Sequence, residues 1–480
     1  FLGLVLSSVG FGWVTKAMGV VLQTVFGVDR AVALAILIAL TVVYAAVSGL
    51  WGVVATDVIQ FAMAMVGAIL MAALAVAQVG GLGALTERVQ ALGAERGRDL
   101  LAMLPTQWDA FAASVAILAF VNWWAVYYPG AEPGGGGYVA QRMLAARDEK
   151  EARSGTLWFL FAHYALRSWP WILTALAAAI LEPRFLDGAP GYEAEHAYPW
   201  MFRLLPVGML GLVVASFFAA YMSTITTMLN LAASFLVQDF LLPIAPRRSR
   251  RTEIALARGT VVFVCAAGCV VAWSLESAGE GWEVIMELTA GSGLVLILRW
   301  LWWRVNAWSE IAAMVASAVG YFLANRTAVG REIVARLGGG DAELTRNMRL
   351  LLIVGYTTVV WVAVTLATAP TSRATLVEFY RRVRPGGVWG TVPEEAGLPR
   401  VRLRRELAMW GASTLLILGA LLGVGAGLLG KPVAGVAWLT TAVAGWIALR
   451  ALVRGERETF AGGGAAAPQA GNMLHTPSSM

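Results

Sequence analysis

The sequence predicts an all-α protein that crosses a membrane many times. Of its 480 residues, 59% are hydrophobic and only 14% are charged, whereas a soluble domain carries about 25% charged residues. Apolar runs of about 20 residues, the length that a helix needs to cross the hydrocarbon core, recur along the chain. These runs must be helical in a lipid bilayer, because an α-helix satisfies its own backbone hydrogen bonds.

About twelve spans meet this length criterion. Their approximate ranges are 1–27, 31–49, 54–79, 109–128, 157–181, 207–240, 258–276, 283–303, 308–325, 349–368, 407–429 and 434–452. The sixth span, Val207–Phe240, is about 51 Å long as a straight helix at ~1.5 Å per residue. We expect it to tilt, break or project, because the hydrocarbon core is about 30 Å thick.

The longer connections differ in character. Residues 81–108 and 182–204 are predicted to be external and partly helical. Residues 371–405, which include LVEFYRRVRPGG, predict a basic amphipathic segment on the cytoplasmic surface. The end of the chain, residues 454–480, is mostly low-complexity sequence and is predicted to be disordered.

Lysine and arginine are unevenly divided between the two sides. One side holds 22 basic residues and the other holds 12. The richer side comprises 141–156, 245–258, 299–304, 371–405 and the tail after Leu449. Because basic connections stay in the cytoplasm, we expect this side, and with it the C terminus, to be cytoplasmic in a multi-pass protein of the cell membrane.

Composition and motifs exclude several function classes. The net charge of +6 does not indicate a nucleic-acid partner, because basic loops on one face of a membrane produce the same value. The two cysteines, Cys265 and Cys269, lie in an apolar run and predict no disulfide framework. No HExxH motif, GxSxG elbow or Cys/His metal spacing is present, so we do not expect an enzyme. No obligate protein partner can be inferred.

The sixth span carries a stripe of small and polar residues on one helical face. The stripe consists of Ser216, Ala220, Ser223, Thr224, Thr227 and Asn230. Small hydroxyl residues commonly form close helix–helix contacts in membranes. Their oxygens are also the ligands that a small hard cation prefers. The stripe alone is compatible with both interpretations.

Three other spans contain polar residues that lipid would not favour. Asp57 opens the third span, where it is either functional or an acid that stabilises the start of the helix. In the fourth span Asn122, with Trp123 and Trp124, forms either an interfacial aromatic belt or a stacking wall for a small solute. Glu287 lies in the eighth span, just before a glycine-rich stretch that permits an unwound or tightly packed segment.

His163 and Arg167 lie four residues apart in the fifth span and share a helical face. Pro170 follows, and we expect it to break the helix. Two donors beside a break would suit a polar or anionic solute. The alternative is that Arg167 reaches the interface.

Several of these stretches together resemble the sodium:solute symporter family, which includes the sodium–glucose and sodium–proline cotransporters. They are SGLWGVVATDVIQ, GGGGYVAQRMLAARDEKEA, HYALRSWPWI, AAYMSTITTMLNLAASFLVQDF and LILRWLWWRVNAWSEI. The resemblance extends over about residues 1–310. It implies the leucine-transporter-like fold, in which two inverted five-helix repeats form the core and further helices lie at the periphery.

The resemblance implies a division of the chain. Residues 1–80 would be the remainder of the first repeat and 109–306 the second. Residues 307–370 would form peripheral spans, and 406–453 the two C-terminal spans. The first two core helices would be missing, so we expect the chain to be truncated at its N terminus. We therefore expect these 480 residues alone not to transport.

The resemblance also assigns roles to residues. A sodium ion would be held by the Ala220 carbonyl and by the hydroxyls of Ser223 and Thr224. Thr227 would line a second sodium position, and Asp57 matches an acid near the inner sodium pathway.

The solute side is assigned in the same way. Asn122, Trp123 and Trp124 match the solute wall. His163 falls where the sugar transporters of the family place a cationic contact, and the histidine departs from that pattern.

The predicted function is sodium-coupled symport of a small organic solute by alternating access, with Na⁺ as the coupling ion and the bilayer as surroundings. A proton-coupled carrier of the same fold, with His163 or Asp57 carrying the proton, and a symporter-like membrane sensor are the alternatives. Amino acids, sugars, carboxylates and vitamin-like anions all remain open as solutes. His163 and Arg167 favour one with a carboxylate.

Overall fold

The computed structural model describes residues 2–47, 50–97, 99–104, 145–189, 192–237, 249–340, 342–401 and 403–462, with the single residues 117, 121, 124, 139, 143 and 244. Most of the fourth predicted span, including Asn122 and Trp123, lies outside this set, as do residues 463–480 of the predicted tail. The chain divides into two compact units, residues 1–401 and 402–480, and each is described by itself.

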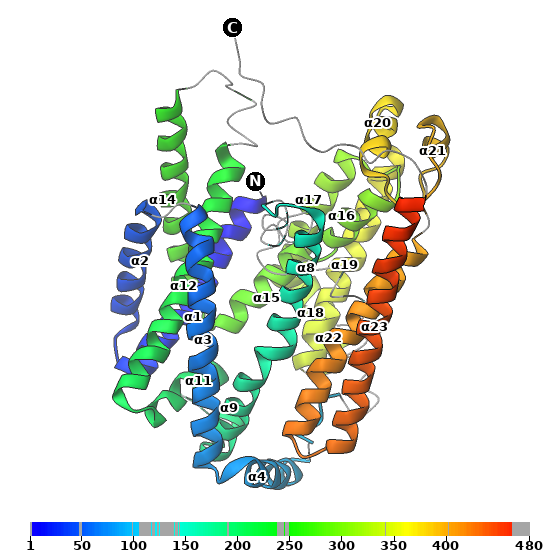
Figure 1. Ribbon diagram of the computed structural model, residues 1–480. Helices are drawn as coiled ribbons and strands as arrows, with labels where there is room; N and C mark the ends of the chain where they lie inside the picture. The colour runs from blue at the N-terminus through cyan, green and yellow to red at the C-terminus, as the bar shows by residue number, and fades with distance from the viewer. Residues whose placement is uncertain are drawn as a thin grey trace. The chain divides into compact units, whose positions relative to one another are not determined.

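The first unit is built from long helices that run side by side (Figure 1). They are α1 (Leu2–Phe26), α2 (Arg30–Val47), α3 (Leu50–Gln78), α8 (Glu149–Leu160), the π-helical η3 (Phe161–Leu166), α9 (Ser168–Leu181), α12 (Val207–Ser234), α14 (Arg250–Ser274), α15 (Ala278–Thr289), α16 (Ser292–Leu301), α17 (Ala307–Arg326) and α19 (Ala342–Ala367). Further helices lie in the connections: α4 (Gly81–Glu95), α10 (Arg184–Asp187), α11 (Ala194–Trp200), the 3-10 helix η4 (Met201–Leu204), α18 (Ala328–Gly338), α20 (Arg373–Val383) and α21 (Val392–Glu395).

Across the described residues of both units, nine helices are long and apolar enough to cross a membrane, or ten if the bent pair α15–α16 counts as one span. This confirms the all-helical, multi-pass membrane architecture. The inverted-repeat arrangement and its domain boundaries stay a prediction. The connections 81–108 and 182–204 contain α4, α10, α11 and η4, so they are partly helical as expected.

Helix α1 lies at the centre of the first unit. About 67% of its apolar window is buried, against at most 44% for the other described spans. It packs against α12, α14 and α15. The contact with α14 is close because Gly12 and Gly268 each leave room for the other helix, beside Val271 and Phe11 respectively.

The eighth predicted span is broken. Helices α15 and α16 meet at an angle of 46°, and Gly291 at the junction has a φ of 85°. A Cβ at Gly291 would lie 2.6 Å from the Cβ of Thr357 in α19. Glycine is therefore required here both for its backbone conformation and for the close approach of α19.

The apolar face of the amphipathic segment 371–401 packs largely against the segment itself, and its place on the membrane surface stays a prediction. The apolar side of α20, with Leu376 and Tyr380, is buried against Trp389 and Val392 in a small core of its own. Val388 pairs with the end of α16, where its N–H donates to the Leu301 carbonyl at 2.6 Å. The segment therefore covers much of its own apolar face.

The second unit is a helical hairpin of α22 (Arg404–Leu428) and α23 (Pro432–Gly462). Gly419 and Gly423 let the two backbones approach, since a Cβ at Gly419 would lie 2.7 Å from the Ala442 nitrogen. Helix α23 continues to Gly462, so residues 454–462 are helical and the prediction of disorder is wrong for them. Residues 454–458, Arg-Gly-Glu-Arg-Glu, include arginine and glutamate, which favour helix.

Candidate functional site

The rotation of α12 is set by one tyrosine. The Tyr221 hydroxyl lies 3.2 Å from Oγ1 of Thr15 in α1 and 3.1 Å from Oγ1 of Thr41 in α2. All three residues are at most 3% exposed. Because polar groups buried among helices need partners, this cluster of three hydroxyls holds one face of α12 against α1 and α2.

The polar stripe of α12 does not share the face on which Tyr221 contacts α1 and α2. Ala220 and Thr224 are exposed, Ser223 is half-buried, and Thr227 is buried. Oγ1 of Thr224 donates to the Ala220 carbonyl at 3.0 Å, and Oγ1 of Thr227 donates to the Ser223 carbonyl at 3.0 Å. The structure thus brings together all four predicted sodium ligands of α12 within two helical turns.

The hydrogen bonds of these hydroxyls affect what they can bind. A hydroxyl has one proton and two acceptor lone pairs. Since Thr224 and Thr227 already donate their protons to the backbone, their remaining lone pairs can face a cation. Neutral oxygens of this kind are ligands for a hard cation such as Na⁺.

The predicted fifth span is continuous but distorted. Pro170 does not break it, because helical structure runs from Glu149 to Leu181. A π-helical turn lies just before the proline, in which the Arg167 N–H donates to the Ala162 carbonyl at 3.0 Å. The proline ring cannot donate to Leu166, so the preceding turn widens instead of ending the helix.

The π turn carries the predicted solute-binding pair. Nη2 of Arg167 lies 3.1 Å from Nε2 of His163, and its guanidinium stacks over Trp171 at 4.8 Å. The His163 ring packs against Phe159 and Tyr164. The structure therefore confirms that His163 and Arg167 share a face, and Arg167 is engaged inside the span.

The other predicted site residues are placed less fully. Trp124 packs against a cluster formed by α17, α18 and α19 together with Ala290 at the bend. Asn122 and Trp123 lie outside the described residues. The backbone of Asp57 belongs to the second turn of α3, which starts at Leu50. The helix-start interpretation of Asp57 is therefore wrong, because a helix dipole acts mainly on its first turn.

A second polar cluster fixes α15, the first half of the broken span. Glu287 of α15, whose side chain is 5% exposed, lies 3.2 Å from Nη1 of Arg349 in α19. It also accepts a 2.7 Å hydrogen bond from Asn325 of α17, and Arg349 donates to Asn325 at 2.9 Å. Glu287 could be identified from the sequence but its two partners could not, since residues 38 and 62 positions away give no local signal.

Comparison with known proteins identifies similar sequences. The chain is 27% identical to a sodium/glucose cotransporter of Vibrio parahaemolyticus over 62% of this chain and 58% of that protein. It is 25% identical to the sodium/myo-inositol cotransporter 2 of Mus musculus, over 62% of this chain and 48% of that protein. A sodium/mannose cotransporter of Bos taurus is 26% identical, over 59% and 52% respectively.

The chain spans about half the length of these curated relatives. The sequence model of the sodium:solute symporter family matches residues 14–320, which include every predicted site residue. The family and these relatives are transporters and not enzymes. The match covers more than half of the chain, and the chain therefore belongs to the sodium:solute symporter family.

Proposed function

We propose that this chain forms part of a sodium-coupled secondary active transporter, which carries a small organic solute across the cell membrane by alternating access, with its C terminus in the cytoplasm. The observation that carries the proposal is the geometry of α12. Tyr221 holds one face of the helix against α1 and α2, and the oxygens of Ala220, Ser223 and Thr224 remain at its accessible or half-buried surface.

The relatives support the choice of sodium. Those named above are all sodium cotransporters, and the oxygens of α12 are neutral, as suits a monovalent cation that must be released again. In this proposal Na⁺ is taken up by the α12 oxygens together with groups on other helices. Its movement down the gradient supplies the energy for solute uptake.

The chemical class that we propose for the solute is based on the pair His163–Arg167. Both side chains belong to the middle part of the fifth span and are hydrogen-bonded to each other. A carboxylate is the partner that an arginine donor recognises most strongly. We propose a small solute with a carboxylate, whereas the relatives in the comparison are named for glucose, myo-inositol and mannose.

The test is uptake by proteoliposomes that contain the natural protein carrying this chain. We expect uptake to require an inward sodium gradient, and Thr224→Ala or Ser223→Ala to raise the sodium concentration for half-maximal uptake about tenfold, as the loss of ~1.4 kcal/mol predicts. Thr226→Ala is the matched control. Thr226 also bonds to its own i−4 carbonyl, at 2.8 Å, but is buried on another side of α12.

Two results would overturn the proposal. Uptake that persists when choline replaces sodium at a fixed pH gradient would establish a proton-coupled carrier. An equal loss in Thr226→Ala and Thr224→Ala would show that the hydroxyls stabilise the helix and bind no ion. Competition by carboxylates but not by glucose or myo-inositol is expected for the solute, and the reverse would establish a sugar or polyol site.

A further inference from the structure

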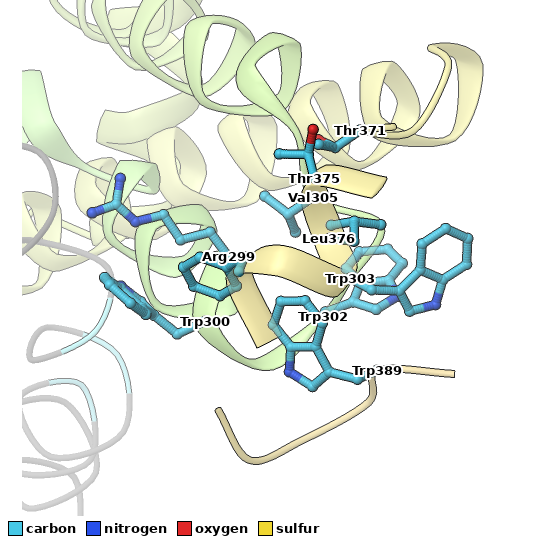
Figure 2. A pocket seen from close by; sticks show the side chains of 10 residues that line it. Arg299, Trp300, Trp302, Trp303, Val305, Thr371, Thr375, Leu376 and Trp389 are labelled. Atoms are coloured by element: carbon cyan, nitrogen blue, oxygen red, sulfur yellow. The ribbon is translucent and has the colours of Figure 1, made fainter. Parts of the chain in front are cut away.

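A cavity of about 350 Å³ lies where the segment 371–401 meets the end of α16 (Figure 2). Its volume falls within the range of small-molecule sites, about 300–1,000 Å³. The walls come from the end of α16, from the turn before α17, and from α20. None of the predicted sodium and solute residues is among the residues that line this cavity.

One wall of the cavity is a continuous row of aromatic rings. Trp300 and Phe379 lie 5.8 Å apart, and Phe379 and Trp389 are stacked at 5.6 Å. Trp302 and Trp303 complete the lining on the α16 side. Indoles concentrated at the end of a span are typical of the membrane–water interface, where one end of a ligand is apolar and the other is wet. Trp300 is 42% exposed, so the wall can be reached from outside.

The polar edge of the cavity is basic. Arg299 lines it, with Thr371 and Thr375. Nη1 of Arg299 is 3.2 Å from Glu310, but its buried Nε has no hydrogen-bond partner among the described residues. The adjoining segment 371–401 contains five arginines and three glutamates. The cavity therefore combines an apolar wall with an arginine at its edge, beside a segment of net positive charge.

We propose that this cavity binds an acidic phospholipid. An acyl chain lies against the aromatic row, and the phosphate lies at the Arg299 guanidinium. A zwitterionic lipid gains less from the basic edge, and inorganic phosphate has no apolar part to cover the indoles. The lipid would hold the segment 371–401 to the end of α16, next to the backbone pairing of Val388 with Leu301.

Native mass spectrometry of the purified full-length protein tests this proposal. The protein is delipidated, then exposed to equal amounts of phosphatidylglycerol and phosphatidylcholine. We expect one phosphatidylglycerol to be retained in preference to phosphatidylcholine. Thr375→Phe fills the cavity and should remove this lipid, and Thr371→Phe does the same from the other side if the first variant fails to fold. Trp308→Ala is the control, because Trp308 is 61% exposed nearby and lies outside the cavity lining.

A second pair of variants separates lipid binding from a structural role of the ion pair. Arg299→Gln removes the cation, and we expect the preference for phosphatidylglycerol to fall about tenfold, the change that ~1.4 kcal/mol produces. Glu310→Gln breaks the same ion pair but leaves Arg299 free for the phosphate, so the preference should be kept or raised. A purely structural pair would make both variants lose the lipid alike.

Three outcomes would overturn the proposal: equal retention of phosphatidylcholine, full retention of lipid in a folded Thr375→Phe or Thr371→Phe variant, and loss of lipid in both Arg299→Gln and Glu310→Gln. If inorganic phosphate alone stabilises the protein against heat and phosphatidylglycerol does not, the site is one for free phosphate. None of these outcomes bears on sodium-driven uptake, which is measured separately.

Discussion

The buried polar groups around α12 and those around α15 perform similar tasks with different chemistry. The cluster of Tyr221, Thr15 and Thr41 is neutral and joins α12 to α1 and α2. The cluster of Glu287, Arg349 and Asn325 is charged and joins α15 to α17 and α19. Each fixes one helix against two others that are distant in sequence.

The difference lies in what remains when a partner is lost. Loss of a hydroxyl's partner should lower the free energy of unfolding only slightly, because neutral hydrogen bonds between membrane helices contribute about 0.6 kcal/mol on average. A buried carboxylate without its cation is a large cost, on the order of 3–5 kcal/mol. The neutral cluster is therefore compatible with the ion binding and release that we propose for α12, whereas the charged cluster suits a helix half that is held in place.

The largest expected effect comes from breaking the charged cluster. Arg349→Met leaves Glu287 buried with Asn325 as its remaining described partner, and we expect the free energy of unfolding to fall by about 3 kcal/mol. Denaturation in detergent titrated with sodium dodecyl sulfate measures it. Arg336→Met is the control, because its pair with Glu332 is exposed at 78% and 61% and contributes at most about 1 kcal/mol. Equal losses in the two variants would contradict the comparison.

The next effect concerns the bend beside that cluster. Gly291→Ala combines an unfavourable φ with a clash against Thr357, and we expect a loss of about 2–3 kcal/mol. Gly339→Ala isolates the effect of the unfavourable φ, because the φ of Gly339 is 59° and nothing lies within 4 Å of the added Cβ. It should cost about 1 kcal/mol. If the two variants unfold at the same temperature, the clash with α19 does not lower the stability of the fold.

The neutral cluster should be more tolerant. Tyr221→Phe removes one hydroxyl from between two threonines, and we expect a loss of about 0.6–1.7 kcal/mol in the same titration. Tyr356→Phe, at a position that is 40% exposed, should change nothing measurable. A loss in Tyr221→Phe as large as that in Arg349→Met would refute the contrast between the two clusters.

The smallest effect extends the comparison to exposed ion pairs. Hydrogen bonds from Arg373, and then from Thr391, lower the pKa of Glu395, and Arg400 likewise lowers the pKa of Glu394. A carboxyl whose pKa is lowered by folding stabilises the fold above its ordinary pKa, and that contribution is lost as the pH falls through the lowered value.

Proteolysis of the segment 371–401 should therefore speed up slightly as the pH falls below the ordinary carboxyl range. An acid-active protease such as pepsin measures it. Glu395→Gln should show less of this pH dependence and faster cleavage throughout. A variant that keeps the full pH dependence would assign it to other carboxyl groups.

Hydrophobic runs alone predicted most of the described spans, because a bilayer allows few other structures for an apolar run of about 20 residues. The α12 stripe and the shared face of His163 and Arg167 were also predictable, since both follow from helical periodicity. The stripe's role as a sodium site rests on resemblance to a family and remains to be tested.

Long-range features could not be predicted in the same way. The role of Tyr221 has no local signal in the sequence, because its partner Thr15 is 206 residues away. Residues 371–405 were assigned to the membrane surface from an amphipathic pattern, which records an apolar face but not the packing of Leu376 and Tyr380 against Trp389 and Val392. Pro170 was expected to break a helix that absorbs it through a π turn.

The hydroxyl cluster on α12 has a direction. Oγ1 of Thr41 donates its single proton to the Leu37 carbonyl at 2.7 Å, so Thr41 can only accept from Tyr221. Tyr221, having given its own proton, can only accept from Thr15. Protons therefore point one way, from α1 through α12 to α2. Thr41→Val would leave one hydroxyl proton of the cluster without an acceptor. Thr15→Val would leave only a lone pair of Tyr221 without a donor. The two ends of the cluster are therefore chemically different, although the two oxygen–oxygen distances are similar.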